Sequence, residues 1–238
     1  MSRERATPAI ALALLTALSW AYLYHDATAG YCSRMHHSGT LTDFIMLLLM
    51  WTIMMAAMMV PSAAPMILTF AALNRQRRSR TARLYPTSAF TTAYLGIWAA
   101  FSIAAAAVQW WMTSTAMLSM SMSLASARVA AAVLVIAGVF QWTPWKRTCL
   151  EHCHTPFAFL MAHWRDGYLG AFQMGLHHGI YCLGCCWAVM CLLFVTGVMN
   201  LPWVLGLSLF VLIEKLLPGT ARPAGMVMVL TGIAVLLS

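Results

Sequence analysis

Long apolar runs recur along the whole chain and limit its fold more than any other feature. A helix that crosses a bilayer needs about 20 mostly apolar residues. Backbone groups inside a bilayer must bond to one another, so spanning segments are α-helices or strands of a closed barrel. The runs here are far longer than barrel strands and do not alternate in polarity. We therefore expect an all-α, polytopic transmembrane helical bundle.

Seven runs fit this interpretation. We expect membrane spans at 8–26, 43–72, 87–113, 128–143, 168–196, 201–217 and 224–237. The fourth and the last of these are short, so six spans or a re-entrant segment remain alternatives. The sequence contains no repeat, low-complexity linker or soluble domain, and we expect residues 1–238 to form a single transmembrane domain.

The distribution of charge argues for a membrane rather than a nucleic acid as the surroundings. Charged residues make up only 8% of the chain, whereas soluble domains carry about 25%. With a cytoplasmic N-terminus, all of the 14 Lys and Arg residues except Arg34 and Arg128 fall on the cytoplasmic side. Multi-pass membrane proteins show this bias. The net charge of +8 therefore follows from topology, and we predict no nucleic-acid partner.

The first apolar run also has features of a cleaved signal peptide, because a short basic segment precedes it and residues 27–29 resemble a cleavage site. The run is long, however, and ends in Trp20, Tyr22 and Tyr24. Aromatic residues of this kind are typical of a membrane interface. We favour a retained helix.

The run HHGIYCLGCCW places soft ligand groups inside the expected span 168–196. On a helix with 3.6 residues per turn, His178, Cys182 and Cys185 share one face. Cys186 lies at the edge of that face, and His177 points away from it. Cysteine also packs well as a small apolar residue. Thiolate and imidazole are nevertheless ligands for Cu(I) and Zn(II), and three cysteines so close together favour a metal or redox site.

A second cluster, CLEHCH, lies in the longest inner segment. Cys149 and Cys153 are one helical turn apart and share a face, His152 flanks that face, and His154 points elsewhere. The spacing differs from the CxxC of zinc ribbons and thioredoxin-like sites. We expect these residues to supply two metal ligands that need a third from elsewhere. The alternative is a pair of reduced cytosolic thiols.

Methionines crowd the expected span 43–72. One stripe holds Met46, Met50, Met54 and Met58, and a second holds Met55, Met59 and Met66. Methionine is a common core residue, but its thioether also binds Cu(I). Beside the Cys/His cluster, we expect weak intermediate metal sites at Met54, Met55, Met58 and Met59.

Three other segments give predictions about local structure or metal capture. Pro61 and Pro65 predict a break or kink in the second span. Residues 144–167 predict a short helix at the inner membrane interface. The outer loop YCSRMHH, from Tyr31 to His37, could capture a metal ion, although two histidines in a loop also bind metals weakly by chance.

Glu214 and Lys215 lie near the inner end of the sixth expected span, where charges are costly unless they are paired or reach the interface. Lys215 can extend its ammonium group to the interface. Glu214 can pair with Lys215, Lys146 or Arg147, which would be an orienting rather than a catalytic role.

These blocks resemble a family of bacterial integral membrane proteins that are described as predicted metal-binding proteins, a domain of unknown function of which some members are named copper chaperones. The matching segments are MMAAMMVPSAAPM, FQWTPWKRTCLEHCHTP, GLHHGIYCLGCCWAVMCLLFVTGVMN and the Glu214-Lys215 pair. The resemblance covers about residues 43–218, and HGIYCLGCCW is its most specific part. It implies an integral fold in the bacterial inner membrane and a soft metal ion. Where family members show Arg, this chain has His154.

The leading hypothesis is an integral membrane protein that binds a soft metal ion, Cu(I) before zinc, and holds or delivers copper to a membrane or periplasmic cuproenzyme. The expected buried site consists of His178, Cys182, Cys185 and Cys186, and the expected cytoplasmic-side site of Cys149, Cys153 and His152. The sequence has no P-loop and no phosphorylatable Asp motif. Any transport would then be passive, ion-coupled or driven by a partner.

Two alternatives from other classes remain open. One is a membrane thiol oxidoreductase coupled to quinone, which needs a cysteine pair near the outer face at a separation that a disulfide can span. Cys32 is the only clear outer cysteine, and this counts against an oxidoreductase. The other is a structural subunit of a larger membrane complex that uses its Met and Trp faces for packing.

Overall fold

Helices are the regular secondary structure of the residues that the computed structural model describes, which are 3–29, 40–77, 84–115 and 126–237. The helices are α1 (Arg3–Ala29), α3 (Leu41–Arg77), α4 (Leu84–Ser114), α5 (Ala127–Phe140), α6 (Pro144–His154), α7 (Pro156–His163), α8 (Gly167–Met190), α9 (Leu193–Thr196), α10 (Leu201–Leu216) and α11 (Ala221–Leu237). The expected all-α class is confirmed.

Length and apolar composition identify the helices that can cross a membrane. Within the described ranges there are four, at Ala6–Ala29, Leu41–Arg75, Pro86–Ser114 and Gly167–Thr196. A fifth span results if α5 and α6, which meet at 65°, count as one broken span. Helices α10 and α11 have 16 and 17 residues, fewer than the roughly 20 that a full crossing needs. The chain therefore has the helices of a multi-pass membrane protein.

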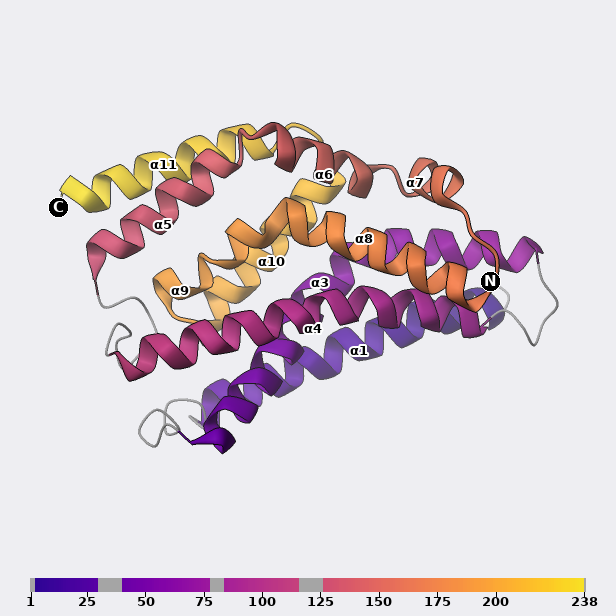
Figure 1. Ribbon diagram of the computed structural model, residues 1–238, viewed down its shortest axis with the longest axis horizontal. Coiled ribbons are helices and arrows are strands. Elements are labelled where there is room, and N and C mark those ends of the chain that lie inside the picture. Colours follow the sequence, from indigo (N-terminus) through magenta and orange to yellow (C-terminus); the bar gives the residue numbers. More distant parts are fainter. Residues whose placement is uncertain (1–2, 30–39, 78–83, 116–125, 238) are drawn as a thin grey trace.

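The long helices α1, α3, α4 and α8 form the main bundle, and α10 crosses it at a steep angle (Figure 1). Helices α5 and α11 form an antiparallel pair beside this bundle. Small residues bring the backbones of this pair together, because a Cβ atom added at Gly138 would lie 2.8 Å from the carbonyl oxygen of Gly225. Glycine contacts of this kind are common between membrane helices.

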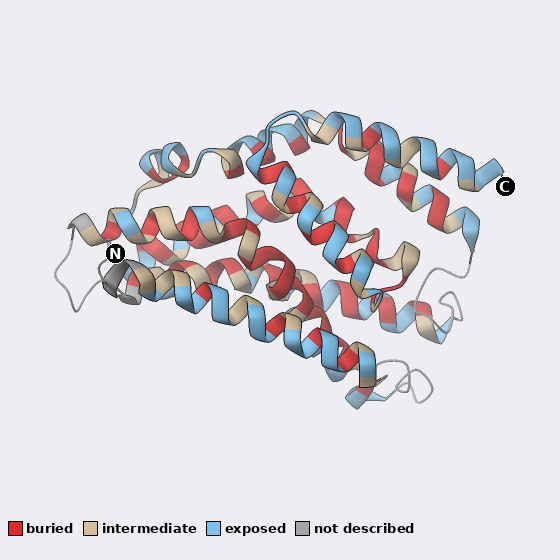
Figure 2. Cartoon of the chain, turned by 180° about the vertical axis from the view of Figure 1, so that it is seen from behind, coloured by how far each residue is buried: buried red, intermediate tan, exposed pale blue. Residues whose placement is uncertain are grey.

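Helix α3 contributes much of the core. The four methionines in the range 54–59 are all fully buried, and Figure 2 shows buried residues along the middle of this helix. The helix continues through Pro61 and Pro65 to Arg77, so the predicted break does not occur. Figure 1 instead shows α3 changing direction part way along its length. A proline removes one backbone hydrogen bond and can bend a helix without ending it when neighbouring turns hold.

The inner segment forms two short helices rather than one. The side chain of Thr143 accepts a hydrogen bond from the backbone N–H of Lys146 at the start of α6, and Pro156 begins α7. Proline suits the first position of a helix because the N–H there lacks a partner. One face of helix α6 packs against α8 and buries Cys149 and Cys153, while the expected position of the segment at the membrane interface stays a prediction.

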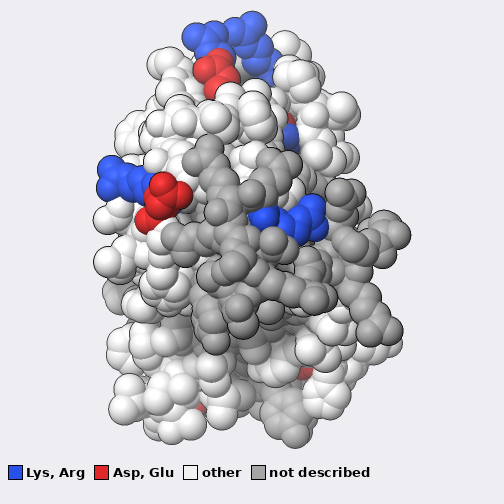
Figure 3. Space-filling model, turned by 90° about the vertical axis from the view of Figure 1, so that its right-hand side faces the viewer, with Lys and Arg blue, Asp and Glu red and all other residues white. Residues whose placement is uncertain are grey.

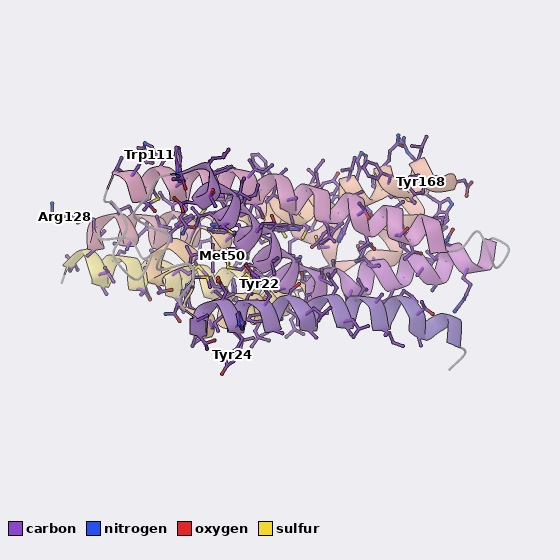
Figure 4. All side chains as sticks on the ribbon, turned by 90° about the horizontal axis from the view of Figure 1, so that it is seen from below. Tyr22, Tyr24, Met50, Trp111, Arg128 and Tyr168 are labelled. Atoms are coloured by element: carbon purple, nitrogen blue, oxygen red, sulfur yellow. The ribbon has the colours of Figure 1, made fainter. Side chains whose placement is uncertain are left out.

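The two ends of the bundle differ in their side chains. Tyr22, Tyr24 and Trp111 lie toward one end together with Arg128, and Tyr168 lies toward the other (Figure 4). Figure 3 looks onto the end that holds the N-terminus and shows Lys and Arg side chains at several places, some of them beside Asp or Glu. Aromatic residues at both ends are typical of proteins that meet two membrane interfaces.

Candidate functional site

The buried face of α8 carries a line of sulfur and imidazole groups. Met174, His178, Cys182, Cys185 and Cys186 are each no more than 2% exposed. Met174, His178 and Cys182 are four residues apart, and Cys185 and Cys186 follow Cys182 by three and four residues, so they lie on successive turns of one helix face. The three thiols therefore point into the protein rather than toward lipid. Cys186, expected at the edge of this face, is as deeply buried as the others.

Two glycines of α8 let neighbouring helices approach this face. A Cβ atom at Gly179 would lie 2.8 Å from the side chain of Ile97 in α4. A Cβ atom at Gly184 would lie 2.8 Å from the sulfur of Cys149 in α6. Both glycines therefore stand where a larger residue would push the adjoining helix away, and donor atoms from α4 and α6 reach the thiols as a result.

Cys182 is the centre of a polar cluster drawn from α3, α4, α8 and α10. Lys215 Nζ donates to Cys182 Sγ over 2.9 Å and to Ser62 Oγ over 2.8 Å. The hydroxyl of Tyr94 lies 3.2 Å from Cys182 Sγ and 3.1 Å from the carbonyl oxygen of Met59. All of these side chains are buried. An arrangement of a thiol, an ammonium group and a phenol in the apolar interior is costly to build unless each group has a partner.

Lys215 does not extend to the interface as the sequence suggested. Its side chain is 6% exposed and turns into the bundle. Ser62 and Cys182 provide acceptors there, so the ammonium group finds partners without water. Lys215 lies in the last turn of helix α10, which has 16 residues, and its side chain is among the buried residues of that helix. Sequence reasoning missed Ser62 and Tyr94 as well: Ser62 lies within the MMAAMMVPSAAPM segment but was not marked as a polar partner there, and Tyr94 belongs to no motif.

The other thiols lie around Cys182. Cys185 Sγ and Cys186 Sγ donate to the backbone carbonyl oxygen of Cys182 over 3.1 and 2.8 Å. Cys149 and Cys153 of α6 are 7% and 8% exposed. The side chain of Cys153 is a hydrogen-bonding neighbour of Cys185. The two cysteine clusters that the sequence placed on separate segments therefore meet across the contact between α6 and α8.

His178 is a buried imidazole with unused nitrogens. Its side chain is 2% exposed, and within the described residues neither ring nitrogen has a hydrogen-bond partner. The ring stacks on Tyr94, with the two centroids 5.4 Å apart. A buried polar group left without a partner costs about 1–3 kcal/mol. An incoming ligand or metal ion that met one of these nitrogens would remove that cost.

His152 is held apart from the thiols. Its Nδ1 lies 2.8 Å from the carbonyl oxygen of Thr148, and because a carbonyl only accepts, Nδ1 carries the proton. The ring stacks on Tyr181 at a centroid distance of 4.2 Å. His154 donates through Nε2 to the carbonyl oxygen of Glu214 over 2.7 Å. His154 therefore joins α6 to α10.

The methionines of α3 divide into one that borders the cluster and several that pack in the core. Met59 Sδ lies 4.0 Å from Ser62 Oγ, next to the ammonium group of Lys215. Met54, Met55 and Met58 are fully buried among apolar side chains, as packing residues would be.

The donor groups do not form a ready metal site. Within the described ranges, no group of three or more His, Cys, Asp and Glu side chains is arranged to hold a metal ion. The sulfurs of Cys185 and Cys186 bond to a backbone carbonyl, and Lys215 occupies the sulfur of Cys182. Binding would require these thiols to turn away from the carbonyl. The outer segment from Tyr31 to His37 lies outside the described residues.

A buried ion pair lies beside the thiols. Lys146 Nζ and Glu214 Oε2 are 2.8 Å apart, with side-chain exposures of 1% and 2%. Lys146 is one of the partners that the sequence suggested for Glu214, and this expectation is confirmed. The pair joins α6 to α10 and so fixes Cys153 and Lys215 relative to each other.

Replacing Lys146 with methionine should destabilise the protein by about 3–5 kcal/mol, because the Glu214 carboxylate would stay buried without its partner. Unfolding by SDS titration from mixed micelles measures this loss. A double replacement, Lys146→Met with Glu214→Leu, should recover most of the lost stability, because it leaves no uncompensated charge. A single variant as stable as the wild type would contradict this role for the pair.

Comparison with known proteins identifies the family of this chain. The chain matches the family model described as "PpoB2: Copper chaperone" over residues 48–235. The match covers most of the chain and includes Met59, Cys182 and Lys215. No curated protein and no solved structure matches the chain closely enough to count as a relative. A helical protein with several long apolar helices and buried cysteines, this chain belongs to the PpoB2 family of copper chaperones.

Proposed function

We propose that this protein binds Cu(I) within the membrane at Cys182, Cys185 and Cys186 and delivers it to a membrane or periplasmic cuproenzyme. The observation that supports this most is the burial of five thiols from α6 and α8 together with the unpaired imidazole of His178. Thiolate and imidazole are ligands that Cu(I) prefers. Structural zinc sites need four protein ligands in a tetrahedron, so we place zinc second.

Lys215 would balance the negative charge of a copper ion bound by two thiolates. A Cu(I) ion held by two thiolates carries a net charge of −1, which is costly in an apolar interior. The ammonium group of Lys215, 2.9 Å from Cys182 Sγ, would balance that charge. Turning Cys185 or Cys186 away from the Cys182 carbonyl would free the second sulfur. The two-thiolate complex with Lys215 beside it would then be neutral overall.

Exchange between neighbouring sulfurs would move the ion without releasing it. Cys153 lies next to Cys185, and Cys149 lies against Gly184 on the same side of α8. A copper ion bound to α8 could therefore pass to the α6 cysteines by replacing one thiolate at a time. Met54, Met55, Met58 and Met59 would be weaker intermediate sites, with Met59 nearest to Lys215. The other copper ligand predicted from the sequence, His152, would need to leave Tyr181 to take part.

The proposed topology places the protein in the bacterial inner membrane with seven spans, or six, and a cytoplasmic N-terminus. In that orientation the end that holds α7 and the N-terminus faces the cytoplasm (Figure 1). Helices α10 and α11 would complete the set of spans, and α5 with α6 would form one broken span. In that topology most of the Lys and Arg residues of the sequence are assigned to the cytoplasmic side, in agreement with the charge bias of inner-membrane proteins.

A metal titration tests the function. Protein purified in lipid nanodiscs should retain Cu(I) under anaerobic conditions against a chromophoric chelator such as bicinchoninate, and should release zinc to a comparable zinc chelator. Elemental analysis of the same preparation before metal is added should show copper in excess of zinc. Failure to hold Cu(I) against the chelator, or retention of zinc instead, would remove the proposal.

The thiol oxidoreductase remains an untested alternative. The described cysteines 149, 153, 182, 185, 186 and 191 are all free thiols in the structure. A disulfide between α6 and α8 that forms on addition of quinone, detected by thiol trapping, would favour the oxidoreductase over copper binding.

A further inference from the structure

We infer that a second metal site, outside the buried thiol cluster, lies in a pocket between α7 and α8. Its ligands are His163, His177 and Met174, and it takes a soft or borderline ion such as copper. The pocket has a volume of about 150 Å³ and is lined by Ala162, His163, Trp164, Arg165, Gln173, Met174 and His177. His177 is the residue that the α8 face pattern left unexplained, since it points away from the cysteines.

The two imidazole rings are close enough to share one ion. Their centroids are 6.0 Å apart, and the ring planes cross at 77°. A metal ion lies about 2 Å from a ligating imidazole nitrogen. Each ring centroid is then roughly 3 Å from the ion, so the rings of one site lie within about 6 Å of each other. The separation of His163 and His177 lies at this limit, so the two nitrogens would bind one ion from nearly opposite sides.

The hydrogen bond of His163 leaves its Nε2 available to bind a metal ion. Its Nδ1 lies 3.0 Å from the carbonyl oxygen of Phe159, so Nδ1 donates and Nε2 keeps its lone pair. Metal-binding histidines commonly donate their second ring N–H to a carbonyl in this way, which fixes the ring and its tautomer. His177 is exposed, and its ring has no hydrogen-bond partner within the described part of the chain.

Met174 connects the pocket to the buried line of donors. It is 1% exposed and lies three residues before His177 and four before His178, so its thioether is near both. Phe159 also touches both regions, with its ring 4.8 Å from that of His163 and 5.8 Å from that of His178. The pocket site would therefore be the outer end of a line through Met174 and His178 to Cys182. That line rests on the proposed function, whereas the pocket site does not.

An anion such as phosphate is the other ligand that this pocket could attract, because Arg165 and two histidines line it. One N–H of the Arg165 guanidinium group donates to the side-chain oxygen of Gln173, which leaves its other N–H groups able to meet an anion. The remaining wall includes the thioether of Met174, which has no hydrogen to donate to an anion. Two nitrogen lone pairs and a thioether sulfur suit a soft cation better than they suit an anion.

A copper titration of the full chain in nanodiscs of phosphatidylcholine tests this site. Cu(I) is supplied anaerobically against a chelator, and X-ray absorption reports the nitrogen and sulfur ligands. The wild type should take up a weaker equivalent beyond the thiol-bound copper. In His163→Ala with His177→Ala, the affinity of this equivalent should fall roughly tenfold or more. Met174→Leu, which preserves the packing volume, should lower only its sulfur contribution. The control is His25→Ala, which removes an exposed imidazole of α1.

The possible results separate this site from the proposed function. The weaker equivalent should persist when Cys182, Cys185 and Cys186 are replaced with serine, even though the thiol-bound copper is lost. A wild type with only thiol-bound copper, or a double histidine variant that keeps the weaker equivalent, would overturn the pocket site alone. If inorganic phosphate binds to the wild type and is lost in the double variant while copper uptake is unchanged, the pocket is an anion site and the inference is wrong.

Discussion

Replacing Cys182, Cys185 and Cys186 together with serine should abolish tight Cu(I) binding. A hydroxyl is a poor ligand for Cu(I), whereas a thiolate is a strong one. Serine is close to cysteine in size, and its hydroxyl can still donate to the Cys182 backbone carbonyl, as the sulfurs of Cys185 and Cys186 do. The fold should therefore survive while the affinity falls by several orders of magnitude. Anaerobic competition with bicinchoninate measures the affinity, and X-ray absorption reports the copper–sulfur bonds.

Two further variants show whether the effect belongs to this cluster. Cys191→Ser changes a partly buried thiol that follows the same helix, and it should leave the affinity unchanged. Cys149→Ser with Cys153→Ser should leave copper bound to α8 but slow its transfer to an added acceptor, because these thiols would receive the ion in the second step. A triple variant with unchanged copper stoichiometry would show that copper, if bound at all, is held elsewhere.

The helical class and the donor face of α8 could both be predicted from local information. Apolar runs of sufficient length predict membrane helices without knowledge of their packing. The shared face of His178, Cys182 and Cys185 follows from the number of residues per helical turn. Neither prediction depends on which helices become neighbours, which explains why both agree with the structure. The metal role of that face stays a prediction.

Contacts between helices could not be predicted in this way. Tyr94 and Lys215 bond to Cys182, and Ser62 bonds to Lys215. These three residues come from different helices, and nothing in their own segments marks these contacts. The interpretation of Lys215 was wrong because a lysine near the end of an apolar run is normally close to the interface. Whether it reaches water depends on the tilt and depth of α10, which packing against neighbouring helices decides.

The methionines and His152 show a second reason why the site could not be predicted fully from the sequence. Sequence spacing alone cannot separate a thioether that binds metal from one that fills the core. The structure brings Met59 to the edge of the polar cluster and leaves Met54 among apolar neighbours. His152 flanks the cysteine face of α6 as expected, but its ring is stacked on Tyr181. A neighbouring aromatic ring from another helix has no signal within the CLEHCH segment.

Replacing Lys215 with methionine should weaken Cu(I) binding even though no ligand is removed. Methionine keeps much of the side-chain volume but leaves a two-thiolate copper complex with an unbalanced negative charge. Two unit charges about 4 Å apart interact by roughly 4 kcal/mol at an effective dielectric constant of about 20. Since about 1.4 kcal/mol corresponds to a factor of ten in affinity, the dissociation constant should rise roughly a hundredfold to a thousandfold. The anaerobic chelator competition measures this change directly.

The opposite result, tighter Cu(I) binding on replacement of Lys215, is also physically reasonable, so the experiment distinguishes two accounts of this lysine. The ammonium group occupies the sulfur of Cys182 in the structure, so it could act mainly as a competitor that copper must displace. In that case Lys215→Met would tighten Cu(I) binding, and the charge-balance account would be wrong. Ser62→Ala removes the second acceptor of the ammonium group but keeps its charge, so it should have a small effect. Lys215→Arg, which also keeps the charge, should retain most of the affinity that methionine loses, because charge balance requires a cation beside Cys182 rather than a particular side chain.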